Sequence, residues 1–167
     1  MLAYHPALDP YHNALRLLQL LIYRGSEYEL DALRILDFFL IFPEDITSVR
    51  LPRNAIGWRA NVRSLSNPYW FEGDRLLVFA QMKAIQDTAL SLLSARGLID
   101  PDALRDGKVR LIPDKVPPTL NGLVHAKNAE VATLIGFLVR DLAELPVRGR
   151  DGLKDRSKLM EFRYDAP

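Results

Sequence analysis

The chain has 167 residues, which is enough for one domain with a hydrophobic core. Apolar residues make up 49% and charged residues 26%, and the net charge of +1 excludes a protein that is basic along its whole length. The absence of cysteine excludes disulfides and thiolate metal sites. The N-terminus lacks a basic segment followed by an apolar run, so we expect no signal peptide and a cytoplasmic protein.

The first predicted helix covers residues 10–24. Asp9 can cap it, Pro10 occupies the first helical position, and Gly25 follows the last turn. Leucines at helical spacing along this segment form a wide apolar stripe. We therefore expect one face of this helix to lie in the core.

The second predicted helix begins at a capping box. Ser26 and Glu29 have the spacing in which each side chain caps the other's backbone N–H. The apolar residues that follow spread almost all round the helix, which must end near Pro43. This pattern predicts a helix that is buried on several sides or covered by a partner chain.

A long connection spans residues 43–73, with a short helix expected over 54–64. Connections of this length inside a compact domain are uncommon and often functional. Residues 46–71 contain no acid but hold four arginines, and the connection ends in three consecutive aromatics. These aromatics fit either local core or a partner contact. The residues concerned are Arg50, Arg53, Arg59 and Arg63, followed by Tyr69, Trp70 and Phe71.

The second half of the chain predicts a long helix, a short β element and another helix. Asp74 and Gly97 bound a helix over residues 74–96. Alternation of apolar and basic residues over 107–113 predicts a strand, with Ile99 pairing with it or packing beneath it. The double proline at 117 and 118 stops the strand. A final helix is expected over 125–145.

This order of elements predicts a mainly α fold with a small β element. A helix that leads through Gly97, Leu98 and Ile99 into a β ribbon is typical of winged-helix domains, whose polar ribbon projects as a wing. We expect a winged-helix-like domain over 1–146 and a C-terminal arm over 147–167. If the protein lies near DNA, the basic side chains that we expect there are Arg59, Arg63, Lys108 and Arg110.

The C-terminal arm ends in alternating apolar and charged residues. Met160, Phe162 and Tyr164 alternate with charged side chains, which is the period of a strand with one buried face. Such a strand either completes the domain's own sheet or adds to the sheet of a partner. If it meets a partner, the expected contacts are Leu153, Met160, Phe162 and Tyr164, together with Tyr69, Trp70 and Phe71.

No constellation of catalytic or metal-binding residues is visible in the sequence. It lacks a phosphate-binding loop and a nucleophile paired with a base. His5, His12 and Asp9 lie close together in sequence, but capping explains Asp9 equally well, and metal sites need three or more ligands in one place. We therefore expect no enzyme, no metal and no cofactor.

Three blocks of the sequence resemble one protein family. They are residues 4–12 (YHPALDPYH), 34–43 (RILDFFLIFP) and 152–165 (GLKDRSKLMEFRYD), of which the last is the most specific. The chain resembles the middle component of bacterial ABC-three-component systems. Related middle components occur in Lamassu-type anti-phage defence systems. The resemblance implies a non-catalytic adaptor between an SMC-like or Rad50-like ABC ATPase and an effector, often a nuclease. It also implies proximity to the backbone of duplex DNA.

A second hypothesis is a homodimeric winged-helix transcription regulator that acts alone. Such a regulator needs an exposed recognition helix with several basic residues. The helix over 74–96 carries only Arg75, Lys83 and Arg96, which counts against this hypothesis.

Overall fold

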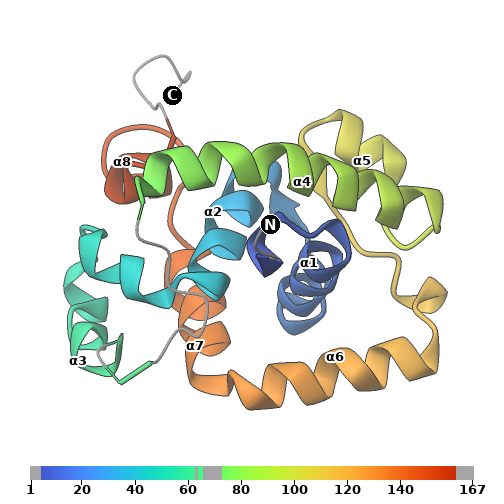
Figure 1. Cartoon of the computed structure of the whole chain (residues 1–167), viewed down its shortest axis with the longest axis horizontal. Helices are drawn as coiled ribbons and strands as arrows, with labels where there is room; N and C mark the ends of the chain where they lie inside the picture. Colours follow the sequence, from blue (N-terminus) through green and yellow to red (C-terminus); the bar gives the residue numbers. More distant parts are fainter. Residues whose placement is uncertain (1–4, 63, 66–72, 161–167) are drawn as a thin grey trace.

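The computed structural model describes residues 5–62, 64–65 and 73–160. It confirms a mainly α fold with a small antiparallel β element (Figure 1). Short 3₁₀ turns occur at Pro6–Leu8, Pro43–Ser48, Arg53–Ala55 and Pro113–Lys115. The α-helices are α1 (Pro10–Arg24), α2 (Leu30–Ile41), α3 (Trp58–Val62), α4 (Arg75–Ala95), α5 (Pro101–Arg105), α6 (Pro118–Glu130), α7 (Ala132–Phe137) and α8 (Leu153–Ser157).

The capping signals correctly located helices α1 and α4. The carboxylate of Asp9 accepts hydrogen bonds from the backbone N–H groups of Tyr11 and His12, at 2.8 and 3.0 Å. Gly25 ends α1 in the left-handed region, with a φ of 70°. Asp74 caps α4 in the same way, through the N–H of Leu76 at 2.9 Å. Both helices are confirmed because their end signals act on their own backbone.

The predicted capping box at the start of α2 is wrong. Glu29 makes no capping hydrogen bond, and α2 begins at Leu30. Residues 28 and 29 instead form strand β1 (Tyr28–Glu29), which pairs with β2 (Lys108–Val109). Tyr28 is buried, so tertiary pairing overrides the local helix signal. The sheet is extended by a bridge between Ile99 and Leu111, which confirms the expected pairing of Ile99.

The predicted helix over residues 125–145 begins earlier and is interrupted. Pro118 starts α6 as its first helical residue, so the double proline opens a helix as well as ending the β element. The helix breaks at Val131, where φ is −120° and ψ is 27°, and the chain continues as α7 and a π-helical turn over Leu138–Leu142.

Helix α4 lies along one side of the molecule and packs against α1 and α2 (Figure 1). In the described part of the chain, it is the one helix with the length and apolar character of a membrane span. Its seven buried residues lie against the other helices, as expected for a core helix: Val78, Phe79, Met82, Gln86, Ala89, Leu90 and Leu93.

A fully buried carboxylate joins α1, α2 and α4. Asp37 on α2 accepts hydrogen bonds from Asn13 Nδ2 at 2.6 Å and Arg16 Nε at 2.7 Å, both on α1. It also accepts one from Gln86 Nε2 of α4 at 2.8 Å. A buried charge is stable only when it is paired and hydrogen-bonded. Arg16 supplies the opposite charge, and Asn13 and Gln86 supply further hydrogen bonds. The crossing of the three helices therefore depends on a polar group inside an apolar core.

We expect Asp37→Ala to lower the free energy of unfolding by about 3–5 kcal/mol, because it leaves the Arg16 guanidinium buried without its carboxylate. Urea denaturation of the purified protein measures this loss. The matched control is Glu130→Ala, which removes an exposed ion pair to Lys127 and should cost about 0.5 kcal/mol or less. Equal losses in the two variants would contradict the role of Asp37.

Candidate interaction surfaces

The predicted partner contacts fall into three groups in the structure. Met160 is half-buried and packs against the core. Leu153 is 0% exposed and belongs to the core, so in this conformation it offers no surface to a partner. The remaining five lie outside the described residues: Tyr69, Trp70, Phe71, Phe162 and Tyr164.

The first part of the C-terminal block folds back onto the domain. Val147, Leu153 and Leu159 are buried in the same hydrophobic core as α2. Helix α8 packs against α2, and the Lys154 ammonium forms an ion pair with Asp31 of α2 at 2.8 Å. The described part of this block therefore serves the fold, and only residues beyond 160 keep the predicted role of an arm.

Charged side chains join the C-terminal segment to the connection after α2. Arg50 Nη2 lies 2.7 Å from a carboxylate oxygen of Asp151 and 2.7 Å from one of Asp155. Arg156 Nη1 donates to the Arg50 carbonyl at 2.8 Å, and Lys158 Nζ donates to Asp155 at 2.5 Å. We call these five residues the charged clamp.

The clamp makes stability depend on pH. The Lys158 ammonium, the Asp151 backbone N–H and the Arg50 guanidinium hold the pKa of Asp155 well below its usual range. A carboxyl with a lowered pKa contributes stability that is complete above its unfolded pKa of about 3.9 and is lost as the pH falls toward the folded pKa.

We therefore expect the free energy of unfolding to fall as the pH drops below about 5, and Asp155→Asn to make that fall shallower. Urea midpoints measured at several pH values on both proteins give the two slopes. Identical slopes would show that Asp155 does not titrate with folding.

Gly152 is required by close packing at the start of α8. A Cβ at this position would overlap the carbonyl group of Arg148 and lie 2.9 Å from the Pro146 carbonyl oxygen. Its φ of −73° suits any residue, so the constraint is space. Backbone atoms surround the position, and they cannot move away as a flexible side chain could.

We expect Gly152→Ala to lower the free energy of unfolding by about 1–3 kcal/mol, because overpacking shifts the backbone. Gly122→Ala is the matched control, since nothing lies within 4 Å of a Cβ there and the position is inside α6. Alanine is favoured over glycine in helices, so this control should gain about 0.5–1 kcal/mol. Urea denaturation tests both signs in one experiment.

The predicted DNA-proximal residues lie on different parts of the chain. Lys108 and Arg110 form ion pairs with Glu27 beside the small sheet, at 2.9 and 3.3 Å. Arg59 is exposed on α3. Arg63 lies outside the described residues. The Glu27 carboxylate thus partly neutralises the charges of Lys108 and Arg110, whereas Arg59 lies near the charged clamp.

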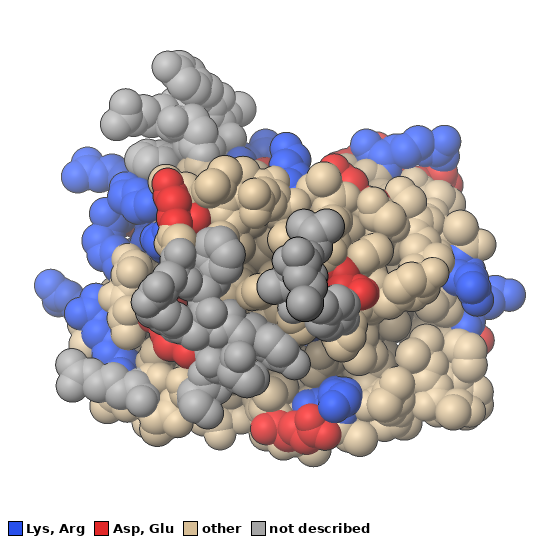
Figure 2. Space-filling model, viewed as in Figure 1, with Lys and Arg blue, Asp and Glu red and all other residues tan. Residues whose placement is uncertain are grey.

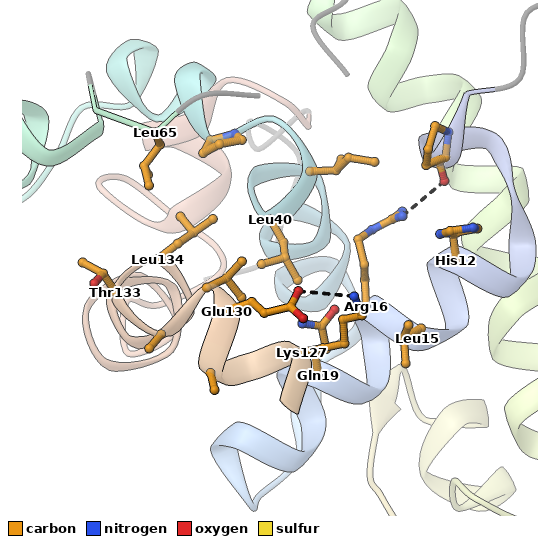
Figure 3. Close-up of a pocket in the computed structure, with 16 residues that line it drawn as sticks. His12, Leu15, Arg16, Gln19, Leu40, Leu65, Lys127, Glu130, Thr133 and Leu134 are labelled. Atoms are coloured by element: carbon orange, nitrogen blue, oxygen red, sulfur yellow. Dashed lines mark hydrogen bonds and ion pairs between the residues drawn. The ribbon is translucent and has the colours of Figure 1, made fainter. Parts of the chain in front are cut away.

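A groove of about 600 Å³ lies where α1, α2, α6 and α7 approach one another (Figure 3). The side chains labelled in the close-up come from α1, α2, α6 and α7, together with Leu65 from the segment after α3. Apolar side chains supply much of its lining, among them Leu15, Leu40, Leu65, Val131 and Leu134.

Several polar side chains of the groove already have partners within the chain. Arg16 donates to the Pro6 carbonyl at 3.2 Å and to Asp37. Lys127 pairs with Glu130 at 3.2 Å. Because these charges are satisfied internally, the groove is better suited to apolar side chains than to a charged ligand.

Two of the residues considered as metal ligands, Asp9 and His5, have structural roles. Asp9 caps α1, and His5 Nδ1 accepts a hydrogen bond from the Ala7 N–H at 3.1 Å. In the described ranges, no group of three His, Asp or Glu side chains is arranged to hold a metal ion.

Comparison with known proteins assigns the chain to a family. A model of the "ABC-three component (ABC-3C) system Middle Component 5" family matches residues 2–165. The chain belongs to this family. Its members work with the other components of such systems, which include an ABC ATPase. No curated protein and no solved structure matches the chain.

Proposed function

We propose that this middle component is a non-catalytic, cytoplasmic adaptor that links an SMC-like or Rad50-like ABC ATPase to an effector nuclease. The observation that carries the proposal is the family match over residues 2–165. The system that it serves is a Lamassu-like defence against phage or plasmids, in which the adaptor couples the ATPase to the effector. In this proposal the adaptor also meets duplex DNA through the phosphate backbone.

We also propose that the domain is winged-helix-like, and the arrangement of the small sheet supports this. Strand β1 lies between α1 and α2, and β2 follows α4, as expected when a ribbon is added to a three-helix core. Helix α5 lies between Ile99 and β2, where a winged-helix domain carries its hairpin. Because α5 takes up most of the segment between Ile99 and β2, few residues there are left to form the proposed wing.

We propose that the ATPase contacts the groove between α1, α6 and α7. The groove presents apolar side chains beside an exposed helix, since α6 buries only Val124 and Asn128 among its residues. Contacts between subunits place apolar side chains at the centre and paired charges at the rim. Leu15 and Leu40 supply the former, and Lys127 with Glu130 supplies the latter.

We expect the tagged full-length protein, expressed from its native operon, to co-purify with the ATPase and the effector. Leu15→Lys should reduce recovery of the ATPase at least tenfold, because it places a charge on the apolar groove. Leu77→Lys is the matched control on α4, where the leucine is 56% exposed, and should leave recovery unchanged. Quantitative mass spectrometry of the eluates measures recovery of the ATPase with the unchanged protein and with each of the two variants.

Truncation should remove residues 161–167 only, because a deletion from 152 would also remove Leu153, Leu159 and part of the charged clamp. Loss of the effector from this shorter truncation supports the predicted contacts of Phe162 and Tyr164. Purification of the full-length chain alone would contradict the adaptor function.

The alternative function is a homodimeric winged-helix regulator. Among the basic residues of α4, Arg75 is already engaged by the Ser157 carbonyl at 3.3 Å and by Asp45 at 3.6 Å. This leaves α4 poorly equipped to read a DNA groove. A homodimer that binds one duplex sequence preferentially would favour this alternative over the adaptor.

A further inference from the structure

Two arginine-rich segments, far apart in the sequence, meet at one edge of the molecule. The Arg50 N–H donates to the Arg156 carbonyl at 3.0 Å, and Arg156 Nη1 donates back to the Arg50 carbonyl at 2.8 Å. Arg59 reaches the same place, because its Nη2 donates to the Val49 carbonyl at 3.5 Å. The charged clamp therefore places α8 beside the connection that leads from α2 into α3.

This surface, which we call the arginine edge, carries a strong positive charge. Figure 2 shows Lys and Arg side chains gathered along the side of the molecule that holds α3 and α8. The edge has six basic side chains and two acidic ones, a net +4, whereas the whole chain carries +1. The edge consists of Arg50, Arg53, Arg59, Arg150, Arg156 and Lys158, with Asp151 and Asp155.

Three of these arginines are available to a ligand. Arg53, Arg59 and Arg150 are exposed. In the part of the chain that the structure describes, the ion pairs of the edge involve Arg50, Arg156 and Lys158 and none of these three. The clamp residues thus hold the edge in place, while Arg53, Arg59 and Arg150 have no carboxylate partner among the described residues.

We propose that the arginine edge binds the phosphate backbone of duplex DNA, independently of base sequence. Arginine is suited to phosphate because its guanidinium donates two parallel hydrogen bonds to one phosphate group. Five of the six basic residues are arginines, and the exposed large apolar side chain between Arg53 and Arg59 is Ile56. A protein partner would need a larger apolar centre, which favours the nucleic acid over an acidic protein surface.

The inference deepens the proposed function and depends on it only for the presence of DNA near the complex. It also changes the residues concerned. Lys108 and Arg110 are paired with Glu27 by the sheet, so the wing is a weaker phosphate site than the edge. The contact would hold DNA against the adaptor while the groove holds the ATPase.

The test measures binding of the full-length chain to an arbitrary-sequence duplex by fluorescence anisotropy across a range of salt concentrations. The edge variant is Arg53→Gln/Arg59→Gln/Arg150→Gln, which spares the charged clamp. The matched variant is Lys108→Gln/Arg110→Gln/Lys115→Gln, which removes the same charge from the β element and from the 3₁₀ turn that follows it. Urea denaturation first confirms that both variants fold.

The slope of log affinity against log salt concentration is negative, and it becomes less negative by about 0.9 for each phosphate contact that is lost. The edge variant, which loses three contacts, should therefore reduce the size of the slope by about 2.7 and weaken binding equally for duplexes of different sequence. The wing variant should change the slope by less than about 0.9, the value for one contact. An unchanged slope in the edge variant, or a larger reduction in the wing variant, overturns the proposal.

Co-purification from the operon separates this inference from the adaptor function. An edge variant that retains the ATPase and effector but loses DNA binding supports both proposals. One that binds DNA normally and loses the ATPase identifies the edge as a protein contact and rejects the DNA proposal, while leaving the adaptor function intact.

Discussion

The buried carboxylate of Asp37 is the interaction on which the rest of the structure depends. It accepts hydrogen bonds from α1 and α4 while belonging to α2, so it defines how these three helices cross. Burying the charge is costly, but the Arg16 guanidinium and two amide donors offset that cost. Because an apolar core tolerates several similar packings, a directional polar contact of this kind favours one arrangement. Arg16 also lines the groove, so the same network positions one wall of the candidate partner surface.

The C-terminal segment connects stability to function. Leu153 and Leu159 fill the core, and the charged clamp ties the segment to the connection after α2. Because of this packing we expect substitutions at Gly152 and Asp155 to be costly, since Gly152 is enclosed by backbone and Asp155 by cations. The same contacts assemble the arginine edge from two segments. A change in the clamp would therefore alter both the free energy of unfolding and the surface proposed to meet DNA.

The groove and the arginine edge differ in chemistry, and we propose that each binds a different kind of partner. The groove is apolar with internally paired charges, which suits another protein, whereas the arginine edge is strongly basic, which suits a polyanion. Such a division allows a small subunit to hold two kinds of partner at once. It also agrees with the family assignment, since a middle component acts together with other subunits.

The sequence by itself determined the features that depend on local backbone chemistry. Asp9, Asp74, Gly25 and Gly97 located the ends of α1 and α4, because caps and left-handed glycines act within one turn. Three blocks of sequence also indicated the family. The spacing of Asn13 and Arg16, which are three residues apart and both buried on α1, was a signal of the Asp37 network that sequence reasoning missed.

Only the tertiary structure decided which polar groups meet and which local signals prevail. Strand pairing with β2 displaced the capping box at Ser26, and packing against α2 placed Leu153 in the core and not on a surface. The arginine edge, likewise, depends on contacts between residues about a hundred positions apart, such as Arg50 and Asp155. Such pairings cannot be read from local pattern, because their free energy comes from burial and charge contacts that exist only once the helices have packed.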